Sequence, residues 1–196
     1  MARLEGDHTA EQLGRLTINP IAHIDLIGTI IIPIVLLVGS MATGRMVAFG
    51  WAKPVPVNPM AFRNPRRGVM LVSLAGPGSN ILLALVACLA LRAIAGPAAA
   101  FAEAGPIVLI LSAIALINLY LAFFNLIPIP PFDGSGVVSS LLPLDLARRY
   151  ESIGRYGTLL VLGLIVVGSF VGIGFIETVV VPPSVALFKV FMGGRM

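Results

Sequence analysis

Charged residues are scarce in this sequence. Only 11% of the 196 residues are Asp, Glu, Lys or Arg, whereas soluble domains average about 25%. Hydrophobic residues make up 58% of the chain, and the mean hydropathy is +1.00. This composition excludes an ordinary soluble domain and predicts a polytopic membrane protein that forms a single domain.

Cysteine and histidine are almost absent as well. Cys88 is the single cysteine and lies inside an apolar run, which excludes a disulfide framework and a thiolate metal cluster. The two histidines, His8 and His23, do not have the i, i+4 spacing that places two metal ligands on one helical face, and the sequence contains no His-Glu-x-x-His motif. The residues present therefore predict weak zinc binding or none.

Four uncharged runs are long enough to cross a bilayer, and they predict an all-α fold with about four transmembrane helices. The runs are residues 26–43, 68–91, 106–127 and 158–176. Residues 26–176 are the expected transmembrane core, and residues 1–25 precede it. Residues 177–196 are apolar but contain Pro182, Pro183 and Lys189, so we expect this tail to lie at the membrane interface.

Basic residues gather in two loops between these runs. The loops 45–67 and 132–155 hold eight arginines and lysines, whereas the loop around Glu103 has no basic residue. The positive-inside rule places the two basic loops in the cytoplasm. The basic charge of these loops gives no reason to expect nucleic-acid binding.

A proline-rich segment follows the third run and ends at an acidic residue. Pro128, Pro130 and Pro131 cannot continue a helix, so the helix should end near Ile127 and a stiff, non-helical arm should carry Asp133. A carboxylate at this depth needs a cation, a proton or a hydrogen-bond donor. Three interpretations stay open: Asp133 belongs to a site, it caps a short helix that begins near Val137, or it opens an Asp-Gly turn at the cytoplasmic surface.

Two asparagines in the apolar runs are candidate site residues. Asn125 precedes the proline-rich segment, and its amide could bond to a neighbouring helix or to a developing oxyanion. Asn80 ends the sequence Ala-Gly-Pro-Gly-Ser-Asn at positions 75–80. This stretch lacks the lysine of a phosphate-binding loop, so its small residues indicate close helix packing.

A segment of alternating prolines and valines lies between the first two runs. The pattern favours an extended, strand-like segment that could accept a substrate peptide as an added strand. A connector with Trp51 at the membrane interface explains the same pattern. The candidate substrate-lining residues are Trp51, Pro54, Val55, Pro56, Val57 and Asn58 of this segment, together with Asn80 of the second run.

Together these motifs resemble the site-2 protease family, the zinc-dependent intramembrane metalloproteases, in its compact bacterial form without a PDZ domain. The resemblance is carried by residues 14–25, 50–59, 75–80 and 125–134. It implies that Asp133 is the third protein ligand of a catalytic zinc ion. It also implies that Asn125 matches the asparagine that helps to hold the substrate carbonyl.

In this family the other two zinc ligands, and the glutamate that activates water, belong to a His-Glu-x-x-His helix. By the resemblance that helix would end just upstream of Met1, so we expect a start codon assigned within the helix or a fragment of a longer chain. The expected activity is cleavage of transmembrane substrates in or beside the bilayer, with the present chain inactive alone. The alternative is a non-catalytic membrane protein of the same fold that binds transmembrane partners.

Overall fold

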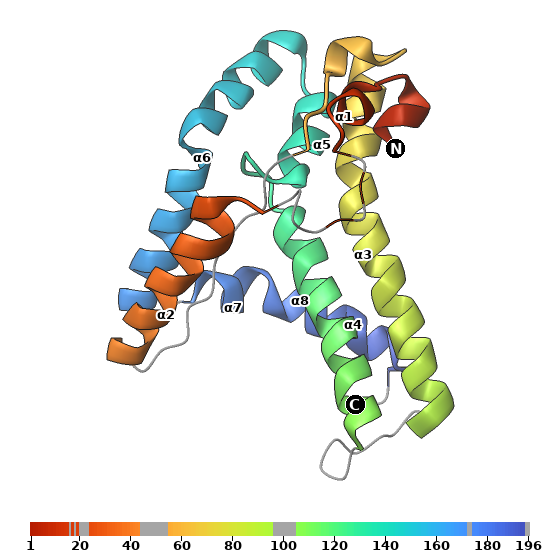
Figure 1. Cartoon of the computed structure of the whole chain (residues 1–196), viewed down its shortest axis with the longest axis vertical. Helices are drawn as coiled ribbons and strands as arrows, with labels where there is room; N and C mark the ends of the chain where they lie inside the picture. The colour runs from red at the N-terminus through yellow and green to blue at the C-terminus, as the bar shows by residue number, and fades with distance from the viewer. Residues whose placement is uncertain are drawn as a thin grey trace. The chain divides into compact units, whose positions relative to one another are not determined.

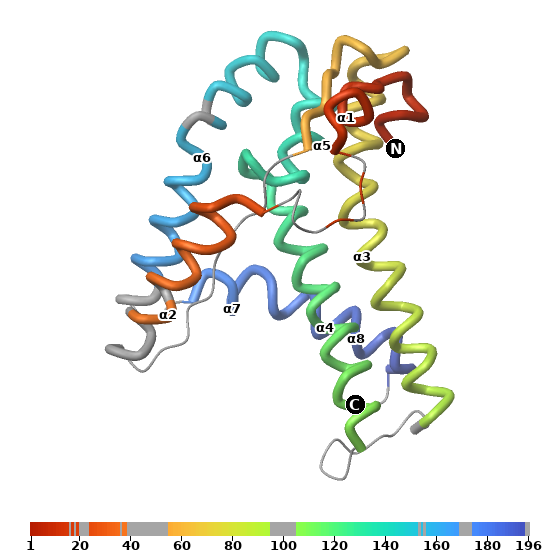
Figure 2. The backbone as a smooth tube through the Cα atoms, in the orientation of Figure 1, coloured from red at the N-terminus to blue at the C-terminus, as the bar shows by residue number. Residues whose placement is uncertain are grey.

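The computed structural model describes residues 1–15, 17, 19, 24–43, 55–95, 105–171 and 174–194. Every regular element within these ranges is helical, which confirms the predicted all-α fold. The chain divides into two compact units, Ala2–Pro65 and Arg66–Met196, and each is described by itself. Figure 2 follows the course of the backbone from one terminus to the other.

The unit Ala2–Pro65 contains short helices. They are η1 (Ala2–Glu5), α1 (Thr9–Gln12), the π-helix η3 (Leu26–Ile31), α2 (Ile32–Thr43) and η4 (Pro59–Ala61). Asp25 begins η3, because its Oδ1 accepts hydrogen bonds from the amides of Ile27 (3.1 Å) and Gly28 (2.7 Å), which have no partner inside the helix. The predicted first span, residues 26–43, therefore coincides with η3 and α2.

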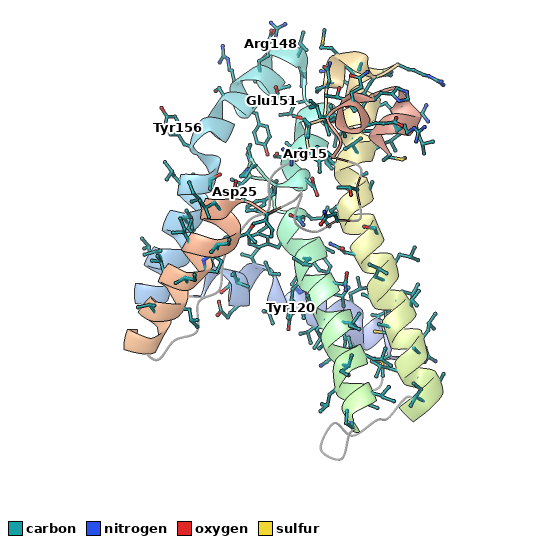
Figure 3. The ribbon with its side chains drawn as sticks, viewed as in Figure 1. Arg15, Asp25, Tyr120, Arg148, Glu151 and Tyr156 are labelled. Atoms are coloured by element: carbon teal, nitrogen blue, oxygen red, sulfur yellow. The ribbon has the colours of Figure 1, made fainter. Side chains whose placement is uncertain are left out.

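The unit Arg66–Met196 contains the longer helices. They are α3 (Pro65–Ala95), α4 (Pro106–Asn125), α5 (Asp133–Leu141), α6 (Leu144–Val171), α7 (Phe175–Val179) and α8 (Val181–Phe191) (Figure 1). The first half of α6 is polar, and Arg148, Glu151 and Tyr156 extend from it as exposed side chains (Figure 3).

The core of this unit lies where α8 crosses α3 and α4 (Figure 1). Small residues such as Ala84, Ala87 and Ala115 are fully or nearly fully buried there and allow the backbones to approach closely. The hydroxyl of Ser184, which is completely buried, donates to the carbonyl of Val180 in its own helix at 2.7 Å. This bond satisfies a polar group that has no water within reach.

The C-terminal tail takes part in this core. Phe188 and Met192 are 5% and 1% exposed and pack with residues of α3 and α4. The tail was expected at the membrane interface because prolines interrupt it, but Pro182 and Pro183 occupy the first turn of α8, where proline fits without breaking a helix. Its depth in a membrane stays a prediction.

Two helices are long and apolar enough to cross a membrane, Pro65–Ile94 and Pro106–Asn125. A third candidate is the bent pair Leu144–Ser152 and Tyr156–Gly168, whose parts differ in direction by 58°. The described residues thus contain two or three candidate membrane spans. The protein is therefore an integral membrane protein. The predicted number of four is not confirmed, because within the described residues the apolar helix of the first run is the shorter stretch Leu26–Val35.

Candidate functional site

The predicted end of the third span is confirmed. Helix α4 ends at Asn125, and the amides of Leu126 and Ile127 close its last turn by bonding to the carbonyls of Ala122 (3.0 Å) and Phe124 (3.2 Å). No further helical turn follows, because the next residues include three prolines that donate no backbone hydrogen bond. The polar side chain of Asn125 therefore lies at the end of the span, half-buried.

Residues 126–132 form a compact, non-helical arm. The amide of Ile129 bonds to the carbonyl of Ile127 (2.8 Å), and the amide of Phe132 bonds to the carbonyl of Ile129 (3.0 Å). The rings of Phe124 and Phe132 meet edge to face, with centroids 4.6 Å apart. These contacts fold the arm back on the last turn of α4, so that Asp133 and Asn125 occupy the same end of that helix.

Helix α6 holds this arm in place. The hydroxyl of Tyr150 donates to the carbonyl of Pro128 at 2.7 Å. A Cβ atom added to Gly154 would lie 3.1 Å from Cβ of Pro130, and one added to Gly157 would overlap the carbonyl oxygen of Pro130. These three positions of α6, which lie before, at and after its bend, all contact the arm. The sequence analysis missed these contacts, although the Tyr-x₃-Gly-x₂-Gly spacing was visible.

The carboxylate of Asp133 has no hydrogen-bond donor among the residues that the structure describes. Helix α5 begins at Asp133 itself, and Phe132 at the N-cap position makes no side-chain bond. The capping interpretation, with a helix that begins near Val137, is therefore wrong. The side chain is half-buried, and this burial raises the pKa of Asp133 above its ordinary value.

Asp133 lies against α3 at a glycine. A Cβ atom added to Gly76 would be 2.9 Å from Oδ2 of Asp133, which is closer than real Cβ contacts. One α5 turn further on, a Cβ at Gly136 would overlap the hydroxyl of Ser73. Gly76 thus has the close-packing role that its sequence indicated, and it leaves space for the carboxylate rather than for a second helix backbone.

Helices α5 and α3 run antiparallel where they meet. Arg66, at the start of α3, donates from Nη2 to the carbonyl of Leu142 at the end of α5 (2.6 Å). The Gly136 and Asp133 contacts follow at successive turns of α3. Gly134, the second residue of α5, permits a further close approach, because a Cβ there would overlap the carbonyl oxygen of Leu126. Asp133 is consequently fixed from two sides.

Asn80 and Asn125 are the two other candidate polar groups in this unit. Asn80 lies one turn after Gly76 on α3, and thus on the same helical face. Both asparagines are half-buried, and the structure shows no side-chain hydrogen bond for either within the described residues. Their amides are free to bind a further polar group.

The candidate substrate segment belongs to the other unit. Trp51 and Pro54 lie outside the described residues, and residues 55–58 form neither helix nor paired strand. Val55, Val57 and Asn58 are exposed, and Pro56 is half-buried. Asn58 has extended backbone angles, and its Oδ1 accepts a bond from the amide of Met60 (3.1 Å) at the start of η4.

A complete zinc site is not formed by the described residues. No group of three or more His, Cys, Asp or Glu side chains within them is placed to hold a metal ion. Asp133 offers a carboxylate oxygen, which is a suitable zinc ligand. His8 is exposed and bonds through Nδ1 to Glu11 (3.0 Å), Cys88 lies in the core, and His23 is outside the described residues. The residues present fit one position of a zinc site.

The fold and the site define the class as an all-α membrane protein with a half-buried carboxylate after a proline-rich arm. Comparison with known proteins identifies the family. The model of Peptidase family M50 matches residues 92–167, which include Asn125, the arm and Asp133. YwhC of Bacillus subtilis (strain 168), described as a predicted zinc metalloprotease, is 39% identical over 170 residues. Rip2 of Mycolicibacterium smegmatis (strain ATCC 700084 / mc(2)155), described likewise, is 28% identical over 161 residues.

These matches cover 85% and 82% of the present chain, and 72% and 57% of the two relatives. No solved structure matches the chain. The chain belongs to peptidase family M50, the site-2-type zinc metalloproteases. The family resemblance predicted from the four motifs is thereby confirmed.

Proposed function

We propose that these 196 residues are part of an intramembrane zinc metalloprotease that cleaves transmembrane substrates in or beside the bilayer. The observation that carries the proposal is the carboxylate of Asp133, which is half-buried, has no hydrogen-bond donor among the described residues and lies against Gly76. A buried carboxylate in this condition is unfavourable unless a cation or a proton compensates its charge. A divalent metal ion is the compensating charge that the family membership supports.

The residues of this chain would hold and position the reacting groups. A zinc ion with three protein ligands lowers the pKa of a bound water and polarises a carbonyl group. Asp133 would be one ligand, held by the arm and by α6. Asn125, at the same end of α4, would donate its amide to the carbonyl oxygen of the substrate.

The segment 51–59 would bind the substrate in an extended form. A helical peptide has its carbonyl groups bonded to its own amides, so the scissile region must lose its helix before a water can attack. The exposed residues Val55 and Val57 show no backbone hydrogen bond within the described part of the chain, so their backbone groups could pair with such a peptide. The proposed partners are thus the lipid bilayer and a transmembrane protein substrate.

The remaining zinc ligands would come from a His-Glu-x-x-His helix that is not among the 196 residues. Without it, we expect weak zinc binding or none. The competing proposal is a non-catalytic protein that binds transmembrane partners, and the reading frame upstream of Met1 separates the two. A frame with a stop codon before any such motif would favour the non-catalytic protein.

The experiment expresses the gene with its full upstream reading frame, and measures the zinc content and the cleavage of a model transmembrane substrate. Asp133→Asn and Asp133→Ala should lose zinc and cleavage while helix content is unchanged. Asp145→Asn is the matched control, because Asp145 is an exposed aspartate in the first turn of α6. Full zinc occupancy and cleavage in Asp133→Ala would remove this residue from the metal site.

We further propose that loops 45–67 and 132–155 face the cytoplasm across a bacterial inner membrane. The test uses the single cysteine of the chain: Cys88 is replaced by serine, and one cysteine is introduced at the exposed position Arg149. An impermeant maleimide should label this cysteine in inside-out vesicles and not in intact cells. Labelling in intact cells would reverse the proposed orientation.

A further inference from the structure

A buried carboxylate lies in the unit Ala2–Pro65, far along the sequence from the site residues described above. The side chain of Asp7 is 3% exposed. Its Oδ1 accepts bonds from the amide of Thr9 (2.9 Å) and from the hydroxyl of Thr9 (2.5 Å). Its Oδ2 accepts a bond from the amide of Asn58 at 2.8 Å. Asp7 thus joins two parts of the chain that are 51 positions apart.

Neighbouring contacts reinforce the same junction. The amide of Arg63 donates to the carbonyl of Glu5 at 3.1 Å. Gly6 has φ +107°, a backbone conformation in which residues other than glycine are strained. A Cβ atom added there would lie 3.1 Å from the carbonyl oxygen of Ala61. Phe62 is buried at 5% exposure. Residues 5–9 and 58–63 therefore form one small folded body within this unit.

The bond from Asn58 lies at the last residue of the exposed segment 55–58, directly before η4. Within the described residues, the Asn58 amide is the only group of residues 55–58 that bonds outside the stretch 55–61. Residues 55–57, which precede Asn58, form neither a helix nor a paired strand. The direction of their free amides and carbonyls consequently depends on how Asn58 is held.

The ionised form of the side chain is required for this role. A carboxylate accepts all three bonds at once, whereas an asparagine in its place would present an NH₂ group to one of the donors. The bonds with Thr9, and then the amide of Asn58, hold the pKa of Asp7 below its ordinary value, so the charged form is present at neutral pH. Hydrogen bonds to charged groups are the stronger ones.

We propose that Asp7 is a positioning residue which, through the Asn58 amide, aligns residues 55–58 to bind an extended peptide substrate. The inference rests on the proposed function, because it names how that substrate segment is held. Asp7 itself does not contact the substrate. Its replacement should weaken substrate binding and leave the chemical step unchanged.

The test uses the full-length protein and three variants of this junction. Asp7→Asn removes the charge, Thr9→Val removes the hydroxyl donor, and Thr9→Ser retains both donors of this residue. Glu11→Gln is the matched control, because Glu11 is an exposed acidic residue of α1 that bonds to His8 and pairs with Arg3. It removes one negative charge from the same region without touching Asn58.

Two readouts separate positioning from a general structural role. Amide hydrogen exchange reports the Asn58 bond directly. Titration of a fluorescent synthetic peptide, made of an apolar 20-residue segment followed by an alternating Val-Ser stretch, reports substrate binding. For Asp7→Asn we expect the amide exchange rate of the protein fragment that contains residues 55–58 to rise about tenfold. We expect the Kd for the fluorescent probe to rise about tenfold as well. The kcat for cleavage should stay within about twofold. Thr9→Ser and Glu11→Gln should resemble the wild type.

Unchanged exchange at Asn58, or faster exchange with an unchanged Kd, would overturn the inference. An absence of probe binding by the wild-type protein would overturn it too. If the wild type binds the probe but has neither zinc nor cleavage, the proposed function fails while the role of Asp7 in binding stands or falls on the Kd alone.

Discussion

Replacement of Gly76 by alanine should separate catalysis from stability. Gly76 lies inside α3, where alanine is more favourable than glycine by about 1 kcal/mol. The added Cβ would be 2.9 Å from Oδ2 of Asp133, and an ordinary contact begins at 3.4 Å. The atom that must move is the end of a side chain, so the fold can adjust. The carboxylate, however, must shift by about 0.5 Å, which is the tolerance that functional constellations allow.

The expected loss follows from this displacement. A misplacement of 1 Å can reduce a rate about 100-fold, so a shift of half that size should reduce kcat about tenfold. The assay measures zinc affinity and cleavage in the full-length protein, with thermal unfolding in detergent as the stability readout. Gly76→Ala should unfold at a temperature close to that of the wild type, because the helix gain offsets the new contact.

Gly78→Ala is the matched control. Gly78 lies two residues further along the same helix, and a Cβ added there meets no atom within 4 Å. It should bring the same gain in helix stability and leave cleavage and zinc binding unchanged. Equal activity in the two variants would refute the reasoning, since the Asp133 position would then not depend on the space at Gly76.

Three further predictions concern the arm and the N-terminal junction. Gly157→Ala should destabilise the protein by about 1–3 kcal/mol, because its Cβ would overlap a backbone carbonyl, whereas Gly163→Ala, with open space around it, should not; equal unfolding temperatures would contradict the contact. Tyr150→Phe should cost about 1 kcal/mol and lower kcat, and an unchanged kcat would show that the hydroxyl does not help to hold the arm. The depressed pKa of Asp7 means that its bonds stabilise the junction above the ordinary pKa of 3.8 and are lost only as the pH falls below it. Amide exchange at Asn58 should therefore stay slow down to that pH, and loss of protection above it would contradict the assignment.

The sequence predicted those parts of the site that depend on local chemistry. Three prolines in four positions end a helix wherever they occur, so the end of α4 and the non-helical arm before Asp133 followed directly from the residues. The approach of Gly76 to a neighbouring group was likewise predictable from a run of small residues. These features need no knowledge of distant contacts.

Other parts depended on contacts that no local pattern reveals. The Asp-Gly-Ser-Gly stretch is typical of a turn, yet α5 begins at Asp133, because Gly134 and Gly136 pack closely on Leu126 and Ser73. The bond between Tyr150 and Pro128 spans 22 positions, and that between Asp7 and Asn58 spans 51. A single sequence shows which residues can donate or accept a hydrogen bond, but it does not show which of them pair.

The bend in α6 lies between the residues of this helix that contact the arm. Tyr150 belongs to the part before the bend, Leu144–Ser152, and Gly157 belongs to the part after it, Tyr156–Gly168. The same short stretch of prolines touches both parts. If α6 straightens, either the hydrogen bond between Tyr150 and Pro128 breaks or the proline arm moves with the helix. In the second case Asp133, which follows the arm, is displaced as well. The bend of α6 and the position of Asp133 are in this way coupled through the proline arm.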